Sequence, residues 1–237
     1  RYALAEETGR QIVDLVEKNL RPSDIIDMQS LENAIRVLMA VGGSTNAVVH
    51  LAAIAGRLGI KLPLSIFDEI SKNTPVLANV KPSGEYLMED LFYAGGVSAL
   101  MRELGSLLHL DKMTVSGRTL GEEIASAETF DSKVIKSVKQ PLNQDGGLVI
   151  LSGNLAPNGA ILKQTAASQH LFRHKGRAVV FENYSDMENR VDDPSLDVTE
   201  DDVLVLRNIG PKGGPGFPEW GFMPIPQKLL KKGVRDM

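Results

Sequence analysis

The chain has 237 residues, of which 43% are hydrophobic and 24% are charged, and its formal net charge is -4. This composition is ordinary for a globular protein, and the acidic balance gives no electrostatic signature of nucleic-acid binding. The lack of cysteine excludes disulfides, cysteine-bound zinc and a thiol nucleophile within these residues. No apolar run reaches the roughly 18 residues of a membrane span and no signal peptide is visible, so we expect a cytoplasmic protein without a membrane partner.

The first half of the chain has the periodicity of helices. Ser30 is expected to cap one of them, and Thr119 and Glu122 have the spacing of a capping box that opens another. Residues 75–80 are expected to form a strand. The main expected helices cover residues 4–20, 31–40, 47–56, 64–70 and 85–107, the last with a break at 93–97.

A double glycine, Gly42-Gly43, separates two of these helices and places Ser44, Thr45 and Asn46 at a fresh helix N-terminus. Hydroxyl and amide groups cap helices there, and the positive end of the helix dipole favours anions. These three residues are therefore candidates for substrate binding. The alternative is plain N-capping without a ligand.

The second half of the chain has the pattern of a β-rich domain. Short β-branched runs are separated by turns rich in glycine, proline and asparagine, and an acidic helical segment at 185–193 is expected to cross between two strands. A polar stretch between 126 and 140 marks the expected domain boundary. The expected strands cover residues 147–153, 160–163, 177–182 and 202–207.

A loop with five glycines and three prolines covers residues 210–221 and follows a buried-type strand. Backbone with so few side chains can approach an ion or ligand closely, and Glu219 lies within it. Because Mg²⁺ is commonly held by one or two carboxylates plus substrate oxygens, Glu219 is a candidate Mg²⁺ ligand. A surface turn with a solvated glutamate is the alternative.

Four segments together resemble the family of dihydroxy-acid and sugar-acid dehydratases, which includes 6-phosphogluconate dehydratase. The matching segments are residues 42–47, 93–96, 146–160 and 213–219, in this order. The resemblance covers essentially the whole chain, and residues 218–226 look more like the pentonate branch than the amino-acid branch. It implies a homodimer or homotetramer that removes water from a 2,3-dihydroxy acid or sugar acid to give a 2-keto-3-deoxy acid.

The resemblance also implies cofactors, because an iron–sulfur cluster acts on the leaving C3 hydroxyl in this family and Mg²⁺ holds the C1 carboxylate and C2 hydroxyl. Glu219 corresponds to one Mg²⁺ ligand. The cluster cysteines and the other Mg²⁺ ligands would precede Arg1, and the catalytic serine would follow Met237. We therefore expect no catalytic residue here and a piece that is inactive alone. A non-catalytic scaffold or oligomerisation module of the same fold is the alternative.

The expected fold class is α/β. Residues 1–128 would form the C-terminal part of a large helical α/β domain. Residues 129–237 would form a β-barrel-like swivelling domain that is incomplete at its C-terminus. The first residue is not methionine and both ends interrupt a secondary-structure pattern, so we expect a piece of a longer protein.

Overall fold

The computed structural model of the chain describes residues 2–209 and 223–237. It combines helices with two small sheets, which confirms the α/β character expected from the sequence. Two compact units are present, the first extending to Thr165 and the second running from Ala166 to Met237.

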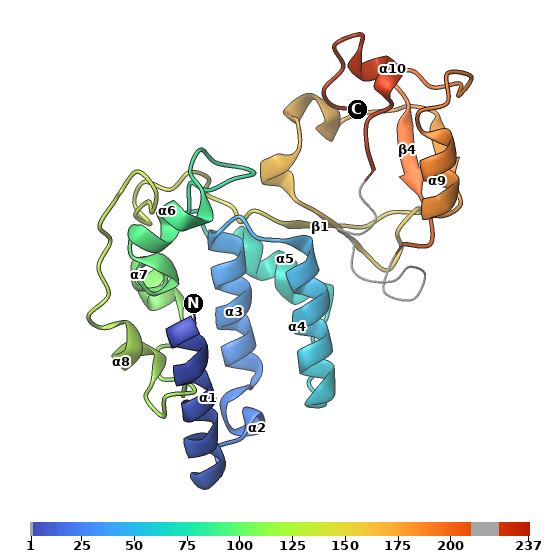
Figure 1. Cartoon of the computed structure of the whole chain (residues 1–237). Coiled ribbons are helices and arrows are strands. Elements are labelled where there is room, and N and C mark those ends of the chain that lie inside the picture. The colour runs from blue at the N-terminus through green and yellow to red at the C-terminus, as the bar shows by residue number, and fades with distance from the viewer. Residues whose placement is uncertain (1, 210–222) are drawn as a thin grey trace. The chain divides into compact units, whose positions relative to one another are not determined.

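The first unit is mainly helical, and α3 packs against α4, α5 and α7 within it (Figure 1). Its helices are α1 (Tyr2–Glu17), α2 (Pro22–Ile25), α3 (Met28–Ala40), α4 (Thr45–Arg57), α5 (Leu64–Lys72), α6 (Met88–Tyr93), α7 (Gly96–Leu104) and α8 (Leu120–Ile124), with a 3-10 turn η1 at Gly105–Leu107. All the helices expected from periodicity are therefore present.

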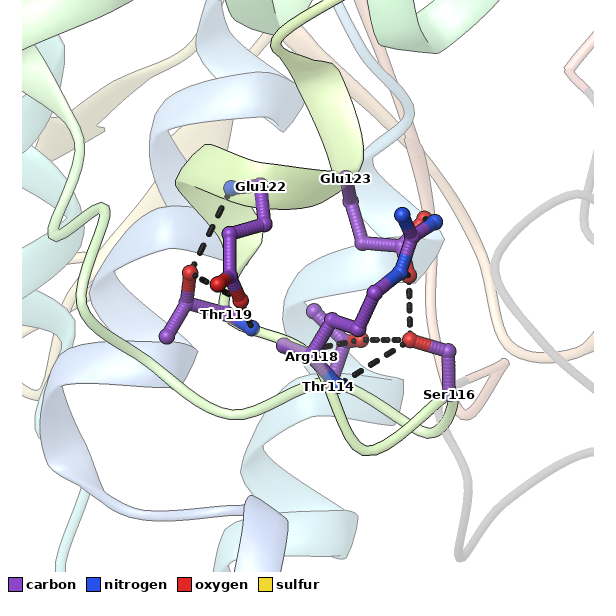
Figure 2. Close-up of polar contacts among 6 residues, drawn as sticks. All are labelled: Thr114, Ser116, Arg118, Thr119, Glu122 and Glu123. Carbon is purple, nitrogen blue, oxygen red and sulfur yellow. Dashed lines mark hydrogen bonds and ion pairs between the residues drawn. The ribbon is translucent and has the colours of Figure 1, made fainter.

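Local capping fixes where α3 and α8 begin. The cap of α3 is Asp27, whose Oδ1 accepts from Ser30 N–H at 2.8 Å, and Ser30 Oγ accepts from Asp27 N–H at 2.9 Å. The prediction that Ser30 itself is the cap was wrong by three residues, because Asp27 completes a reciprocal capping box. For α8 the predicted box is confirmed, since Thr119 Oγ1 accepts from Glu122 N–H at 3.3 Å and Glu122 accepts from Thr119 N–H at 2.8 Å (Figure 2).

Figure 2 also shows how the turn before α8 is held. Arg118 donates to both carboxylate oxygens of Glu123, at 3.0 and 2.9 Å, and Ser116 Oγ donates to the same carboxylate. This side-chain bridge closes residues 114–119 into a tight turn.

Two apolar clusters form on different sides of α3. One gathers Leu77, Leu100 and Ile135, and the other gathers Ile35, Phe67 and Leu148. Residues 75–80 are extended but make only single bridges to three different segments, so the predicted strand is not formed as a ladder. The bridge of Ala78 to Ile135 instead ties the middle of the chain into the helical unit.

A two-stranded antiparallel sheet completes the first unit. It consists of β1 (Val149–Leu151) and β2 (Ala160–Leu162), with Val149 opposite Leu162. These strands confirm two of the predicted ones, although they are shorter. Because β1 packs on α5, residues 129–165 stay with the helical unit, whereas the sequence placed the boundary at 128/129.

The second unit is built on a parallel pair of strands, β3 (Ala178–Phe181) and β4 (Val203–Leu206), joined through α9 (Tyr184–Arg190). Parallel strands need a crossover of this kind, so the predicted crossing helix is confirmed.

Other short elements flank this pair of strands. The 3-10 turns η2 (Gln164–Ala166) and η3 (Gln169–Phe172) precede it, and α10 (Gln227–Leu230) follows it. Phe181, Met187 and Leu229 share its core. Residues 234–237 have no regular structure. Among the described residues, none of the helices combines the length and apolarity needed to cross a bilayer.

A buried carboxylate anchors the start of both parallel strands. Asp202 is 4% exposed and accepts from Arg177 Nε at 3.2 Å, from Arg177 Nη2 at 3.0 Å and from Thr199 N–H at 2.8 Å. The hydrogen bonds from Arg177, followed by the one from Thr199, lower the pKa of Asp202 to about 2. The carboxylate is therefore stabilised in its ionised form.

We expect Asp202→Asn to lower the melting temperature at pH 7. We also expect the stability of this variant to fall less than that of the unchanged protein when the solution is made acidic. An unfolded aspartate has a pKa of about 3.9, so the stabilisation is fully present above that pH and is lost as the pH falls through about 2. Thermal unfolding followed by circular dichroism between these pH values measures both effects. The control is Asp201→Asn, which changes an exposed neighbour. Equal acid sensitivity in Asp202→Asn and the unchanged protein would contradict the assignment.

Candidate functional site

The turn between α3 and α4 is the candidate site, because the glycine motifs of the sequence meet there. Gly42 follows the end of α3 with a φ of 75°, in the left-handed region that glycine tolerates best, and donates to Met39 O at 3.0 Å. Gly43 donates to Leu38 O at 3.0 Å. The chain thus leaves one helix and enters the next within four residues.

Ser44 is the N-cap of α4, with an extended backbone and a side chain that accepts from Asn46 N–H at 3.3 Å. The helix start predicted at Ser44, Thr45 and Asn46 is therefore confirmed. The first turn of α4 carries no acidic residue, so the positive end of the helix dipole is not neutralised by its own sequence. The turn favours an anionic or hydrogen-bonding ligand.

A second glycine pair packs directly on this turn. A Cβ on Gly147 would lie 2.5 Å from Gly42 Cα, and one on Gly146 would lie 2.6 Å from Ser71 Oγ and 2.8 Å from Met39 Cβ. Gly146 also donates to Ser71 O at 2.8 Å. The segments 42–47 and 146–160, about a hundred residues apart in sequence, therefore touch through backbone that has no room for side chains.

Two hydroxyl residues that the sequence did not single out also lie at this turn. Thr165 Oγ1 lies 3.9 Å from the position that a Cβ on Gly42 would take, and Ser83 Oγ donates to Thr165 Oγ1 at 3.0 Å. Neither residue belongs to a recognisable motif. Only the packing of the β2 end and the 81–86 turn beside Gly42 brings them here.

Asn46 is the most informative side chain of the site. It is 7% exposed, and its buried Oδ1 finds no hydrogen-bond donor among the residues that the structure describes. A buried polar atom without a partner costs about 1–3 kcal/mol. Such an atom needs an explanation, and functional sites are a common one.

The other candidate residues are not part of this turn. Gly95 has a φ of 116°, and a Cβ on it would lie 2.2 Å from Glu128 O. The Tyr93–Gly96 segment, which joins α6 to α7, therefore packs closely against residues 128–130. Glu219 lies outside the described residues. Within residues 2–209 and 223–237, no three histidine, aspartate or glutamate side chains come close enough to hold a metal ion.

Comparison with known protein families decides the assignment of the chain. The model of the dihydroxy-acid/6-phosphogluconate dehydratase N-terminal domain matches residues 1–123, and the C-terminal domain model matches residues 133–237. The chain belongs to the dihydroxy-acid/6-phosphogluconate dehydratase family. The resemblance drawn from four sequence segments is thereby confirmed.

Individual relatives within this dehydratase family carry different substrate names. The chain is 49% identical to L-arabinonate dehydratase of Rhizobium leguminosarum bv. trifolii, over 100% of its own length and 41% of that protein. It is 46% identical to L-arabonate dehydratase of Azospirillum brasilense, with the same coverage. It is also 47% identical to dihydroxy-acid dehydratase of Caldicellulosiruptor saccharolyticus, over 92% of the chain and 40% of that protein. The chain thus spans about two fifths of the length of these relatives.

Proposed function

We propose that the complete protein is a hydro-lyase that converts a 2,3-dihydroxy acid or sugar acid to a 2-keto-3-deoxy acid. The observation that carries this proposal is the turn at Ser44–Asn46, in which two motifs of a dehydratase family come together around a buried amide oxygen without a described partner. The three relatives described above are named as dehydratases, which favours an enzyme over the alternative of a scaffold.

Ser44, Thr45 and Asn46 are proposed to bind the substrate in this enzyme. The N-terminal turn of α4 suits an oxygen-rich acid, because its dipole favours negative charge and Asn46 Oδ1 can accept from a substrate hydroxyl. The glycine contacts between Gly42 and Gly147 hold this turn in place. The role of these residues would be to orient the substrate.

Mg²⁺ and an iron–sulfur cluster are proposed as cofactors of the complete protein. The residues present fit them poorly: there is no cysteine for a cluster, and the described residues gather no metal site. Of this chain only Glu219 is proposed as a ligand, to Mg²⁺, and all other ligands would lie outside it. When bound, such metal centres supply positive charge to the oxygens of the substrate.

The architecture proposed for the complete protein is a large α/β domain followed by a swivelling β-barrel-like domain, assembled as a homodimer or homotetramer. The two family models support a division near residue 128, since they match on either side of it. A pentonate is the proposed substrate, supported by the relatives named for arabinonate and by the sequence of residues 218–226.

An assay of the complete protein on a substrate panel tests the proposed function. We expect the 2-keto acid product from at least one of arabinonate, xylonate, gluconate and 2,3-dihydroxyisovalerate, and the highest kcat/KM with a pentonate. Glu219→Gln should reduce turnover by more than the loss of about 10- to 100-fold that is typical for residues that only support a metal ligand. The circular dichroism spectrum should stay unchanged. Absence of any keto acid product from metal-loaded protein would support the scaffold alternative.

A further inference from the structure

One side of α1 carries apolar residues that no described residue covers. Leu15 is the only buried residue of this helix, whereas Tyr2 is 94% exposed and Val16 is 74% exposed. At about 100° per residue, six positions fall within a stripe about 100° wide. This α1 stripe consists of Tyr2, Ala5, Gly9, Ile12, Val13 and Val16.

The α1 stripe is not the side by which α1 rests on its own unit. Leu15 and Gln11 line a cavity of about 330 Å³ together with Val115, and both lie more than about 100° from the middle of the stripe. Ile12, at the edge of the stripe, also lines this cavity. The rest of the stripe is unpartnered among the described residues.

Energetics argue that the stripe is covered in the complete protein. A helix of 16 residues is marginal in water by itself and gains its stability from packing of an apolar face. Each valine or isoleucine that becomes fully buried contributes about 1.5–3 kcal/mol. Gly9 has no atom within 4 Å of the place that a Cβ would take, so with Ala5 it leaves room for the backbone of a second helix to approach.

The charges beside the stripe argue against a second copy of α1 as the partner. Glu6 and Glu17 follow one edge of the stripe, and Arg10 beside them already pairs with Glu6 at 2.6 Å. A twofold contact would bring this acidic edge of both copies together, which is unfavourable. A partner helix with basic residues beside its apolar side fits better.

We propose that the α1 stripe packs against a helix of the same polypeptide that lies outside these 237 residues. The chain matches its relatives along its full length but covers only 41% of them, so a protein of the same size contains ample chain for this role. The proposal goes beyond the proposed function, because it needs the full length of the family but no catalytic activity.

Site-specific photo-crosslinking in the complete protein tests this proposal. With p-benzoylphenylalanine at position 13, or at position 16 if that variant does not fold, irradiation should produce a crosslink within one polypeptide. Mass spectrometry of the digested product should locate it to a peptide outside the 237 residues. The control is position 14, on the acidic side of α1, where the exposed Asp14 should give no such crosslink.

Several results would overturn the proposal. A crosslinked species of twice the mass would identify a second copy as the partner, and a crosslink to Val115 or any other residue of this chain would place the cover within it. No crosslink from positions 13 and 16, equal crosslinking from position 14, or a reading frame without additional residues would show that the stripe has no partner in the same polypeptide. None of these outcomes depends on dehydratase activity.

Discussion

Asn46→Leu is expected to make the complete protein more stable and less active. Leucine has nearly the same shape as asparagine and leaves no buried acceptor unpaired, so we expect a gain of about 1 kcal/mol in the free energy of unfolding. If Asn46 Oδ1 accepts from a substrate hydroxyl, kcat/KM should fall by about tenfold or more, since about 1.4 kcal/mol corresponds to a factor of ten. Urea unfolding and steady-state kinetics measure the two effects.

Asn33 provides the matched control for this change. It is also a buried asparagine, but its Nδ2 donates to His109 O at 3.0 Å and its Oδ1 accepts from His109 N–H at 2.8 Å. Asn33→Leu leaves both backbone groups of His109 unpaired and should lower the free energy of unfolding by about 2 kcal/mol or more. If Asn46→Leu destabilises the protein to a similar extent and leaves kcat/KM unchanged, Asn46 has a structural role.

Gly147→Ala is expected to destabilise the protein and to disturb the site at the same time. The new Cβ would lie 2.5 Å from Gly42 Cα, 2.8 Å from Gly42 C and 3.0 Å from Gly42 O, all backbone atoms that cannot swing away. Overpacking of this kind costs about 1–3 kcal/mol. Because Gly42 lies two residues before Ser44, the start of α4 should shift. Misplacement by about 1 Å can reduce activity about 100-fold.

The matched control is Gly56→Ala within α4, where no atom lies within 4 Å of the new Cβ. Alanine is the better helix former, so this variant should gain about 0.5–1 kcal/mol and retain its activity. Thermal unfolding and kcat/KM of both variants decide the matter. Should Gly147→Ala behave like Gly56→Ala, the close contact of the two glycine segments does not position the turn.

Both predictions concern a site that is assembled largely from backbone. Among the described residues, no group of three or more histidine, aspartate or glutamate side chains is placed to hold a metal ion. The chemistry of this site lies in a helix N-terminus, in one buried amide and in glycines that allow two distant segments to touch. Substitutions that add a single methyl group are therefore as informative here as the removal of a charged side chain.

The amino-acid sequence by itself determined the main helices, the Thr119–Glu122 capping box, the start of α4 at Ser44 and the family. These features depend on neighbours within a few residues, or on motifs whose order along the chain is visible in the printed sequence. Asp27 was missed as the cap of α3 because Ser30 is an equally good capping type three residues later.

Only the tertiary structure decided which distant segments meet. The sequence assigned residues 146–160 to the second domain, yet Gly147 packs on Gly42 and β1 packs on α5. It gave no sign that Ser83 and Thr165 lie beside this turn, or that Asn46 Oδ1 has no described partner. The physical reason is that burial and close packing depend on groups brought together by folding, and the pattern of a local segment carries no information about atoms a hundred residues away.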